Sequence, residues 1–416
     1  MTRAPGPKGG LFLGSLPAFK ADPIGFLGQA VREHGPVVRL RFGPVTAHLL
    51  NAPDHIEHVL SRNAKNYDKA TRSADRIAAA TGQSLLSANS DMWARHRRLI
   101  QPAFQPRCFE AISGPAIDSL LLPAIERWRR QGQIDIVNEM MQLVIAAAIR
   151  ILFSADIKPA SISAPLEALL ADTWRRIEAP FDLSMVSRHL HRRRFSSALK
   201  QIDAIVYGLI AHRKRQDDRP DDVLTRLIDA HEAEGETGLN NKELRDAAIT
   251  LLLAGHETTA NALAWAFIHA AKGHEDAEPR HIFAEALRLH PSIWVIERRA
   301  IGPDAIGGYH IPKGSSVLIS PLLLHRNAAL WPEPEHFEPQ RWADAPTHQR
   351  HAYLPFGLGQ HRCIGLYLAH AMAGHILATV LSKVRLQLLP GQYPAHSAGI
   401  TLQHATAVQL SVSPRP

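Results

Sequence analysis

Apolar residues recur three and four positions apart along much of the chain, the spacing expected for one face of a helix. This pattern predicts a series of helices, over 23–34, 91–100, 140–153, 166–177, 195–215 and 366–377. The run 140–153 is strongly apolar, but a membrane span needs about 20 such residues. We therefore expect it to be a buried core helix.

Strand-like patterns are short and few. Two β-like runs, 37–42 and 46–50, flank a Gly43-Pro44 turn, and 309–314 followed by 316–319 suggests a hairpin. The segment 69–90 is polar and broken by a glycine, and 179–194 lies between two helical patterns. We expect an irregular loop in the first segment and a linker in the second.

The longest helical pattern, 243–271, would be about 40 Å long at about 1.5 Å per residue. Its middle contains Ala254, Gly255, Glu257 and Thr258. The glycine weakens the helix, and the Thr258 hydroxyl can donate back to the Ala254 carbonyl four residues earlier. A local opening beside the ionisable Glu257 would result. The simpler alternative is a buried helix with incidental polar residues.

The stretch 356–365 contains two glycines, Gly357 and Gly359, that suit a tight turn, followed by Cys363 and the helix 366–377. A cysteine at a helix N-terminus is favoured as a thiolate, which is a ligand for haem iron. An isolated cysteine is more often a small buried apolar residue, so the motif must be judged with the rest of the chain.

Two further pairs have the spacing of neighbours on a helix. Trp93 and Arg97 are four apart, so the indole and guanidinium N–H groups could donate to one carboxylate. Alternatively, this basic stretch is a solvated surface. Glu285 and Arg288 are three apart and could form an ion pair, which Arg341 further along the chain could join.

Composition narrows the class of protein. The chain has 416 residues, of which 45% are hydrophobic and 21% charged, as in a soluble globular protein. Its two cysteines, Cys108 and Cys363, make a disulfide framework improbable and fit a reducing cytoplasm. Residues 1–14 are rich in glycine and proline, and we expect neither a signal peptide nor a membrane anchor there.

The charge suggests acidic partners, because the formal net charge is +8 and the isoelectric point about 9.6. No nucleic-acid-binding motif accompanies this charge, so we expect no nucleic-acid partner. An acidic electron-donor protein that docks on a basic face is an equally physical explanation.

Taken together, these motifs resemble a known family. Phe-x-x-Gly-x-His-x-Cys-x-Gly at 356–365 is similar to the haem-ligand signature of the cytochromes P-450, and the motifs around Trp93, Thr258, Glu285 and Arg341 follow in the family's order. The resemblance implies a soluble bacterial-type protein with a single, mainly α, triangular domain over 1–416 and small β-sheets. Haem b would lie between the long helix and the helix after Cys363.

The resemblance also implies roles for individual residues. Cys363 would be the axial ligand of the haem iron, and Thr258 and Glu257 would deliver protons. The other haem contacts would be Trp93, Arg97, Arg298 (or its neighbour Arg299), His361, Phe356, Gly357, Gly365 and Ala254. A structural triad would consist of Glu285, Arg288 and Arg341.

The activity implied is that of a monooxygenase, which inserts one oxygen atom of O2 into a C–H or double bond of a hydrophobic small molecule such as a terpenoid, fatty acid or polyketide. Electrons would come from a ferredoxin or flavodoxin and an NAD(P)H-dependent reductase, and the chain would be a cytoplasmic monomer. The alternatives are a peroxide-driven peroxygenase or isomerase and a non-catalytic haem- or ligand-binding protein.

The family pattern also indicates a substrate cavity and one departure. The cavity would be lined by 79–86, 181–186, Thr250, Ala254, 293–296 and 398–400. Only 27 residues separate Thr258 from Glu285, where most relatives have a further helix. We expect this shorter connection to affect the packing and the docking of partners near that junction, and to leave the haem site unaffected.

Overall fold

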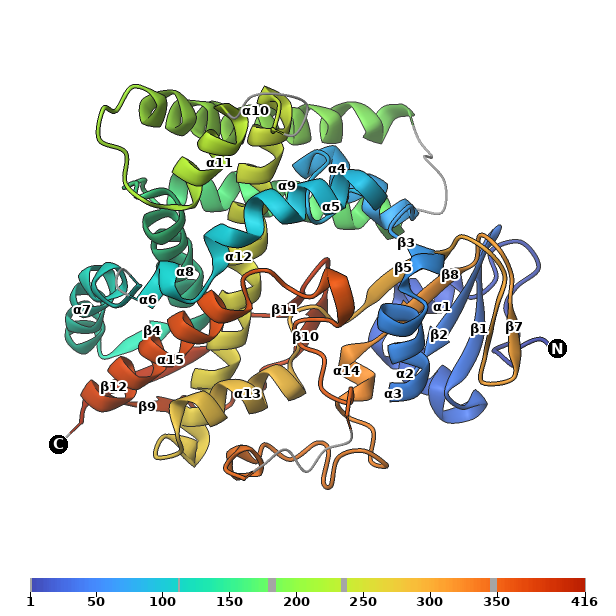
Figure 1. Cartoon of the computed structure of the whole chain (residues 1–416). Helices are drawn as coiled ribbons and strands as arrows, with labels where there is room; N and C mark the ends of the chain where they lie inside the picture. The colour runs from blue at the N-terminus through green and yellow to red at the C-terminus, as the bar shows by residue number, and fades with distance from the viewer. Residues whose placement is uncertain (1, 111–112, 179–184, 233–237, 345–349, 416) are drawn as a thin grey trace.

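One helix, α12 (Asn241–His269), crosses the molecule (Figure 1). A capping box begins it: the Asn240 side chain accepts from the backbone N–H of Glu243, whose carboxylate accepts from the N–H of Asn240. The second core helix, α8 (Ile136–Phe153), packs along it. The computed structural model describes residues 2–110, 113–178, 185–232, 238–344 and 350–415.

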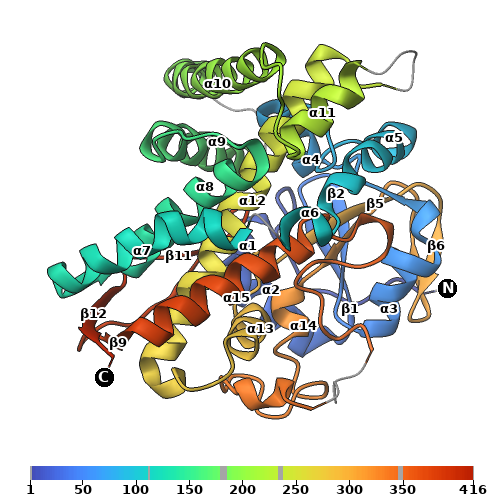
Figure 2. The same ribbon diagram turned by 60° about the vertical axis from the view of Figure 1, so that its left-hand side comes forward.

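Around these two helices lies the largest buried apolar cluster, to which α7 (Ser113–Gln131), α13 (Pro279–Leu289) and α15 (Leu366–Lys383) also contribute. Figure 2 shows α15 running past α12, and the two helices contact each other. The remaining helices are α1 (Leu16–Ala21), α2 (Pro23–His34), α3 (Pro53–Glu57), α4 (Arg72–Thr81), α5 (Ser90–Ile100), α6 (Arg107–Glu110), α9 (Ala160–Glu178), α10 (Met185–Lys214), α11 (Val223–Glu232) and α14 (Pro321–Leu324).

A five-stranded sheet lies at the end of the molecule that carries the N-terminus (Figure 1). Its order is β1 (Val37–Phe42), β2 (Val45–Leu50), β8 (Ser316–Ile319), β5 (Ile296–Ala300) and β3 (Tyr67–Asp68). The β2–β8 pair is parallel and the others are antiparallel. Three smaller sheets contain β6 (Asp304–Ile306) with β7 (Tyr309–Ile311), β10 (His396–Ala398) with β11 (Leu402–His404), and β4 (Gln133–Asp135), β12 (Gln409–Pro414) and β9 (Val384–Leu388).

Several histidines gather where α12, α13 and the β10–β11 hairpin meet. We call Trp265, His269, His290, His396 and His404 the Trp265 cluster. His290 stacks on the Trp265 ring with centroids 3.8 Å apart, and His404 stacks on it at 4.4 Å. His290 Nε2 lies 2.8 Å from His269 Nε2, and its Nδ1 lies 2.7 Å from His396 Nε2. The cluster therefore ties the hairpin to the central helix.

The structure confirms the predicted fold class, because helices dominate and the sheets are small. Helices and strands were predicted correctly at 23–34, 37–42 and 140–153 to within a few residues. The apolar helix α8 is long and apolar enough to cross a membrane, but 61% of it is buried in the protein. That burial is what a core helix requires.

Three expectations were wrong. The segment 69–90 contains the helix α4, because Thr71 caps it by accepting from the N–H of Ala74 and Gly82 ends it with a φ of 76°. In the expected linker 179–194, residues 185–194 belong to α10, and 179–184 lie outside the described residues. Finally, 309–314 does not pair with 316–319: β7 pairs with β6, and β8 pairs with β2 and β5.

Candidate active site

The Cys363 loop is held by backbone hydrogen bonds and by two residues with positive φ. Gly357 and Gly359 both have a φ of 71°, a left-handed conformation that favours glycine. A side chain at Gly359 would also collide with the Leu60 carbonyl oxygen, 2.0 Å from the position of its Cβ. The Cys363 N–H donates to the Phe356 carbonyl at 2.9 Å and so closes the turn.

Cys363 precedes α15, and the residue is accessible to solvent although protein atoms lie densely around it. Contrary to the sequence expectation, burial by the surrounding protein raises the pKa of this thiol. The N–H groups of Gly365 and Leu366 and the charges of Arg97 and Arg362 act in the opposite direction, but burial is the larger effect. The protein alone therefore favours the thiol, and a bound metal cation would be needed to favour the thiolate.

Trp93, Arg97 and His361 lie together beside this loop, on α5 and on the turn before Cys363. The rings of Trp93 and His361 are in contact, with centroids 4.0 Å apart. Arg97 donates through Nη1 to the Arg362 carbonyl at 3.0 Å and through Nε to Gln101 Oε1 at 3.0 Å. Arg97 thus contacts the cysteine loop itself, a contact that the sequence did not indicate.

Arg298 approaches the same region from β5, whereas its neighbour Arg299 forms an ion pair with Asp68 at 2.7 Å. Burial lowers the pKa of Arg298 to about 10, although Glu297 acts against this. Within the described residues no ion pair neutralises Arg298, so it is the better of the two candidates for the second anion-binding arginine.

Lys69 is a third cation in this group, after Arg97 and Arg298, and the sequence analysis missed it. Its Nζ donates to the Leu85 carbonyl at 2.7 Å and lies 5.8 Å from the centre of the Trp93 ring. Burial, followed by the charges of Arg298 and Arg97, lowers its pKa to about 7. Lys69 lies in the segment predicted to be an irregular loop, so only the folded structure brings it to the site.

The cations Lys69, Arg97 and Arg298, together with His361, form what we call the cationic cluster. Burial, followed by the charges of the three cations, lowers the pKa of His361 to about 3, so this residue is a neutral member. In the described part of the chain, no carboxylate forms an ion pair with any of them. His361 also buries its Nδ1 without a hydrogen-bond partner. Buried cations without counter-ions are costly, so the donor set fits a ligand with two carboxylates, as the propionates of haem would supply.

On the opposite side, α12 turns one face outward at its middle. Ala254 is exposed and Gly255 and Thr258 are half-buried, although most of the helix is buried. The Thr258 hydroxyl donates to the Ala254 carbonyl at 2.7 Å, as predicted from the spacing. Ser292 donates to the Thr258 carbonyl at 2.6 Å and anchors this turn of the helix.

Glu257 points elsewhere than its neighbour Thr258. Its side chain is buried and accepts a hydrogen bond from the Gln403 side chain on β11. Burial raises the pKa of the Glu257 carboxyl, while hydrogen bonds from Gln403 and Thr401 lower it to a smaller extent. A carboxyl with a raised pKa can hold a proton near neutral pH and release it to a neighbour.

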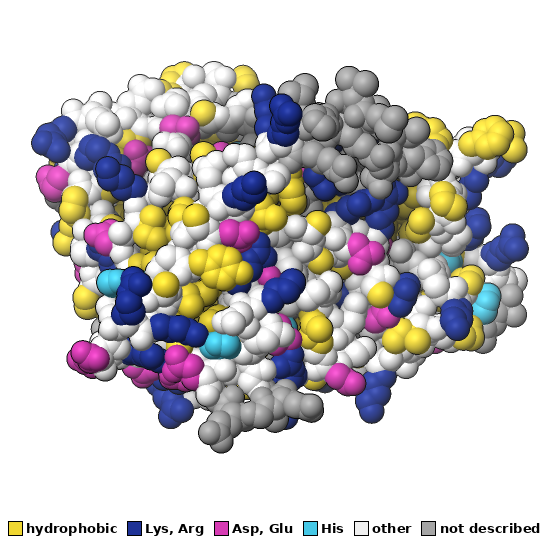
Figure 3. Space-filling view, turned by 90° about the horizontal axis from the view of Figure 1, so that it is seen from above, with side chains coloured by type: hydrophobic (Ala, Val, Ile, Leu, Met, Phe, Trp, Pro, Cys, Tyr) yellow, Lys and Arg dark blue, Asp and Glu magenta, His cyan; other side chains and the backbone are white. Residues whose placement is uncertain are grey.

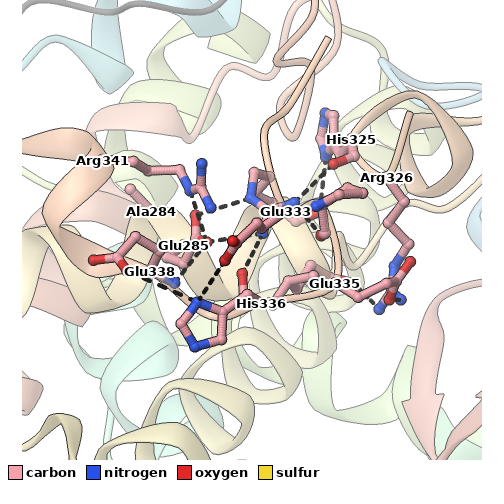
Figure 4. Close-up of polar contacts among 12 residues, drawn as sticks. Ala284, Glu285, His325, Arg326, Glu333, Glu335, His336, Glu338 and Arg341 are labelled. Atoms are coloured by element: carbon pink, nitrogen blue, oxygen red, sulfur yellow. Dashed lines mark hydrogen bonds and ion pairs between the residues drawn. The ribbon is translucent and has the colours of Figure 1, made fainter. Parts of the chain in front are cut away.

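Glu285 forms the centre of a buried ionic network (Figure 4). Arg288 donates to its two oxygens at 2.9 and 2.8 Å, and Arg341 Nε donates at 3.0 Å. The Trp342 indole and the Glu338 N–H donate to the same carboxylate. Arg288 also donates to three carbonyls of the segment 325–336, so the network fixes that segment to α13.

Two of the segments expected to line a substrate cavity are joined by a hydrogen bond. The Trp294 indole donates to the Gly399 carbonyl at 3.0 Å and joins 293–296 to 398–400. Thr250 is buried on α12 with its hydroxyl unpartnered. The side chains of the expected lining segment 181–186 are not among those that the structure describes.

Several known proteins are similar to this chain over most of its length. A family model described as Cytochrome P450 matches residues 4–276 and 280–408. A cyclooctatin synthase from Streptomyces melanosporofaciens is 32% identical over 400 residues, covering 89% of this chain and 86% of its own. A cyclooctat-9-en-7-ol 5-monooxygenase from the same organism is 32% identical over 410 residues, covering 91% and 88%. A pentalenene oxygenase from Streptomyces avermitilis is 26% identical over 424 residues, covering 94% and 93%.

The break in the family match, between 276 and 280, falls at the junction that the sequence marked as short. Here α12 continues into a single wide turn, Ala270–His274, and α13 begins at Pro279. Gly273, with a φ of 106°, allows the chain to reverse. The two helices are thus joined directly, without an additional helix between them.

Proposed function

The chain belongs to the cytochrome P450 family and is a haem-dependent monooxygenase, and from this premise we propose that it oxidises a cyclic, mostly hydrocarbon terpenoid. Three relatives that align over most of the chain have names of this kind: cyclooctatin synthase, cyclooctat-9-en-7-ol 5-monooxygenase and pentalenene oxygenase. This similarity is the observation that carries the proposal. It favours a terpenoid over the fatty acid and polyketide alternatives.

We propose the following roles for individual residues in haem binding. Cys363 ligates the iron, and Trp93 and the cationic cluster hold the propionates. Phe356, Gly357, Gly365 and Ala254 form the surfaces against the ring. Haem, when bound, supplies the dioxygen and electron-transfer chemistry. The Glu285–Arg288–Arg341 network keeps the segment 325–336 in place on the thiolate side.

Proton supply falls to the middle of α12. The Thr258 hydroxyl lies on the exposed face of the helix beside Ala254, where it would be a proton donor to the site once haem is bound. Glu257, whose pKa is raised by burial, is the ionisable group next to Thr258 in the chain that would replenish its proton. The hydrogen bond from the Thr258 hydroxyl to the Ala254 carbonyl fixes the orientation of this hydroxyl when no ligand is bound.

Electrons reach the site from other proteins in this proposal. We propose an acidic ferredoxin or flavodoxin, itself reduced by an NAD(P)H-dependent reductase, as the donor to a cytoplasmic monomer. The support is the basic composition of the chain and the lysine and arginine side chains spread over the face shown in Figure 3. Charge complementarity accelerates such transient encounters.

The substrate proposal is tested by adding a panel of cyclic terpenes, fatty acids and polyketides to the purified, haem-loaded protein. We expect a substrate-induced change of the haem spectrum with at least one cyclic terpene. We also expect a hydroxylated or epoxidised product when ferredoxin, reductase and NADPH are added. Binding of fatty acids or polyketides alone would contradict the terpenoid proposal.

The same samples separate the alternative activities. Turnover with hydrogen peroxide that exceeds turnover with the donor proteins would favour a peroxygenase. Binding without any product under either condition would favour a non-catalytic ligand-binding protein. Dependence on the donor proteins and on dioxygen is the result we expect.

A further inference from the structure

A second cavity lies in the N-terminal part of the molecule, between the N-terminal segment, the β1–β2 strands and the β6–β7 hairpin. Its volume is about 370 Å³, within the range of small-molecule sites. It is lined by Arg3, Arg39, Thr46, His48, His310 and Pro312. None of these residues belongs to the haem site described above.

The lining residues are arranged by depth. His48 is 1% exposed, Arg39 and Thr46 are half-buried, and Arg3 and His310 are exposed. The backbone fixes this arrangement, because Arg39 and His48 are register partners in the β1–β2 pair. The His310 N–H donates to the Thr2 carbonyl and brings the N-terminal segment to the same place. The cavity thus has a histidine at its base and cations around it.

The charges of this cavity lack counter-ions. In the part of the chain that the structure describes, neither Arg3 nor Arg39 forms an ion pair with a carboxylate, and no acidic residue lines the cavity. Two guanidinium groups and two imidazoles therefore surround one space. A guanidinium group binds phosphate oxygens in a bidentate manner, which suits it to oxyanions.

His48 gives the cavity a group that can take up a proton. Its Nδ1 lies 2.7 Å from Ser315 Oγ, and Ser315 donates to the Thr46 carbonyl at 3.2 Å. Nδ1 of His48 therefore donates to Ser315, and Nε2 is left to accept a proton. Burial, followed by the charges of Arg39 and His310, lowers the pKa of His48 to about 4, so it is neutral at pH 7.

We propose that this cavity binds a phosphate group, carried either by a small phosphorylated metabolite or by a lipid headgroup. Arg39 and Arg3 bind the phosphate oxygens, and His310 closes the mouth. A bound anion offsets the repulsion that Arg39 and His310 exert on a protonated His48. Binding is accordingly coupled to proton uptake at Nε2 of His48, and it tightens as the pH falls.

Calorimetric titration of the haem-loaded full chain at low ionic strength tests the proposal. The probes are inorganic phosphate, pyrophosphate and sulfate, and we expect saturable binding of one anion per chain. Sulfate keeps its charge between pH 5.5 and 7.5. Any change of its affinity with pH therefore arises from titration of groups in the protein. We expect that affinity to rise as the pH falls, by at most about tenfold per pH unit for one proton.

Variants locate the binding. Arg39→Gln is expected to weaken the binding of pyrophosphate at least tenfold, and His310→Gln, at an exposed position, several-fold. Lys313→Gln removes a positive charge next to Pro312 from a residue that does not line the cavity, and it should change the affinity less than twofold. If Arg39→Gln does not fold, as judged by its haem spectrum, His310→Gln and Arg3→Gln provide the comparison.

Sedimentation with vesicles separates the two sources of phosphate. Binding to phosphatidic acid vesicles that free pyrophosphate displaces, with no binding to phosphatidylcholine vesicles, would assign the lipid headgroup. Binding of free pyrophosphate without vesicle binding would assign a soluble metabolite. The proposal is overturned if no probe binds saturably, or if Arg39→Gln, His310→Gln and Lys313→Gln weaken binding equally.

Discussion

Single side chains determine how tightly this protein can hold its cofactor. The cationic cluster contains three cations and the neutral His361, and Lys69 is the cation that no sequence motif marks. Its pKa is about 7 in the protein alone, and a propionate beside it would raise that pKa. Haem binding should therefore strengthen as Lys69 becomes protonated.

Replacing Lys69 with methionine should weaken haem binding by about tenfold, the effect of one lost hydrogen bond to a charged group at about 1.5 kcal/mol. Haem transfer to apomyoglobin, followed by absorbance, measures the rate of loss. Lys65→Met is the control, because this exposed lysine lies four residues earlier and outside the cluster. Equal rates for Lys69→Met and Lys65→Met would exclude Lys69 from the haem site.

Gln403 controls the proton affinity of Glu257, because its amide donates to that carboxylate and so lowers its pKa. In Gln403→Leu this hydrogen bond is lost and the pKa of Glu257 rises. If protonated Glu257 supplies protons, the pH at which product formation declines on the alkaline side should shift upward. The shift is measured from turnover between pH 6 and 9 with saturating electron donor.

The conservative variant Gln403→Asn and the variant Gln387→Leu, on β9 in a different sheet, provide the comparison for that experiment. Gln387 is exposed and has no contact with Glu257, so its variant should retain the original profile. A Gln403→Leu profile that coincides with that of the unaltered protein would show that Glu257 does not limit turnover.

At this scale the sequence indicated most of the site, because the residues concerned occur in short motifs. Spacing alone predicted the bond from Thr258 to the Ala254 carbonyl. It could not indicate Lys69 or Gln403, whose partners lie in distant segments, nor the pKa of Cys363, which depends on all the atoms packed around it. The roles assigned to these residues remain predictions until variants are measured.

Among the elements, α12 shows a conflict between helix stability and the shape of the site. Gly255 lies in the middle of the helix, yet a Cβ there would meet only Leu152 Cδ1, at 4.0 Å. Packing therefore does not require glycine. Its place on the same face as Ala254 and Thr258 indicates that the site does.

Gly255→Ala should accordingly raise the free energy of unfolding by up to about 1 kcal/mol, the helix-propensity difference between the two residues. It should also weaken the binding of a bulky substrate, because the added methyl group faces the site. Thermal unfolding and spectral substrate titration measure the two effects. Gly208→Ala, at an exposed position of α10, should show the stabilisation alone. Loss of stability in Gly255→Ala would contradict this account.

Element boundaries were predicted well where a cap or a long apolar face defines them, as in α2 and α8. The helix α4 was missed because it is short and its apolar residues are mostly alanines within a polar segment. The pairing of β8 was wrong because strand partners depend on tertiary contacts: β8 joins β2, more than 260 residues away, rather than its sequence neighbour β7. The expectation of one domain over 1–416 stays a prediction.

For the molecule as a whole, the Trp265 cluster predicts sensitivity to acid. Burial lowers the pKa of His269 to about 3 and the pKa values of His396 and His404 to about 4, and that of His290 lies well below its usual range. These histidines are neutral in the folded protein, whereas in the unfolded chain they take up protons near pH 6.5. Their contribution to stability is therefore complete above about pH 6.5 and is lost as the pH falls towards 4.

The expected slope is about 1.4 kcal/mol per pH unit for each histidine that is protonated only on unfolding. Denaturant unfolding between pH 7 and 5 measures it. His396→Phe should reduce the slope by the contribution of one histidine, about 1.4 kcal/mol per pH unit. His336→Gln, at an exposed site, should leave the slope unchanged. An unchanged slope in His396→Phe would show that the cluster is not the source of the acid sensitivity.

The pairing of β2 with β8 and of β4 with β12 has a consequence for how the protein is made. A ribosome delivers the N-terminal strands long before their partners, so β2 must wait for residue 316 and β4 for residue 409. During that interval these strand edges are unpaired and prone to aggregate. The sheets can therefore be completed only after residue 409 has left the ribosome.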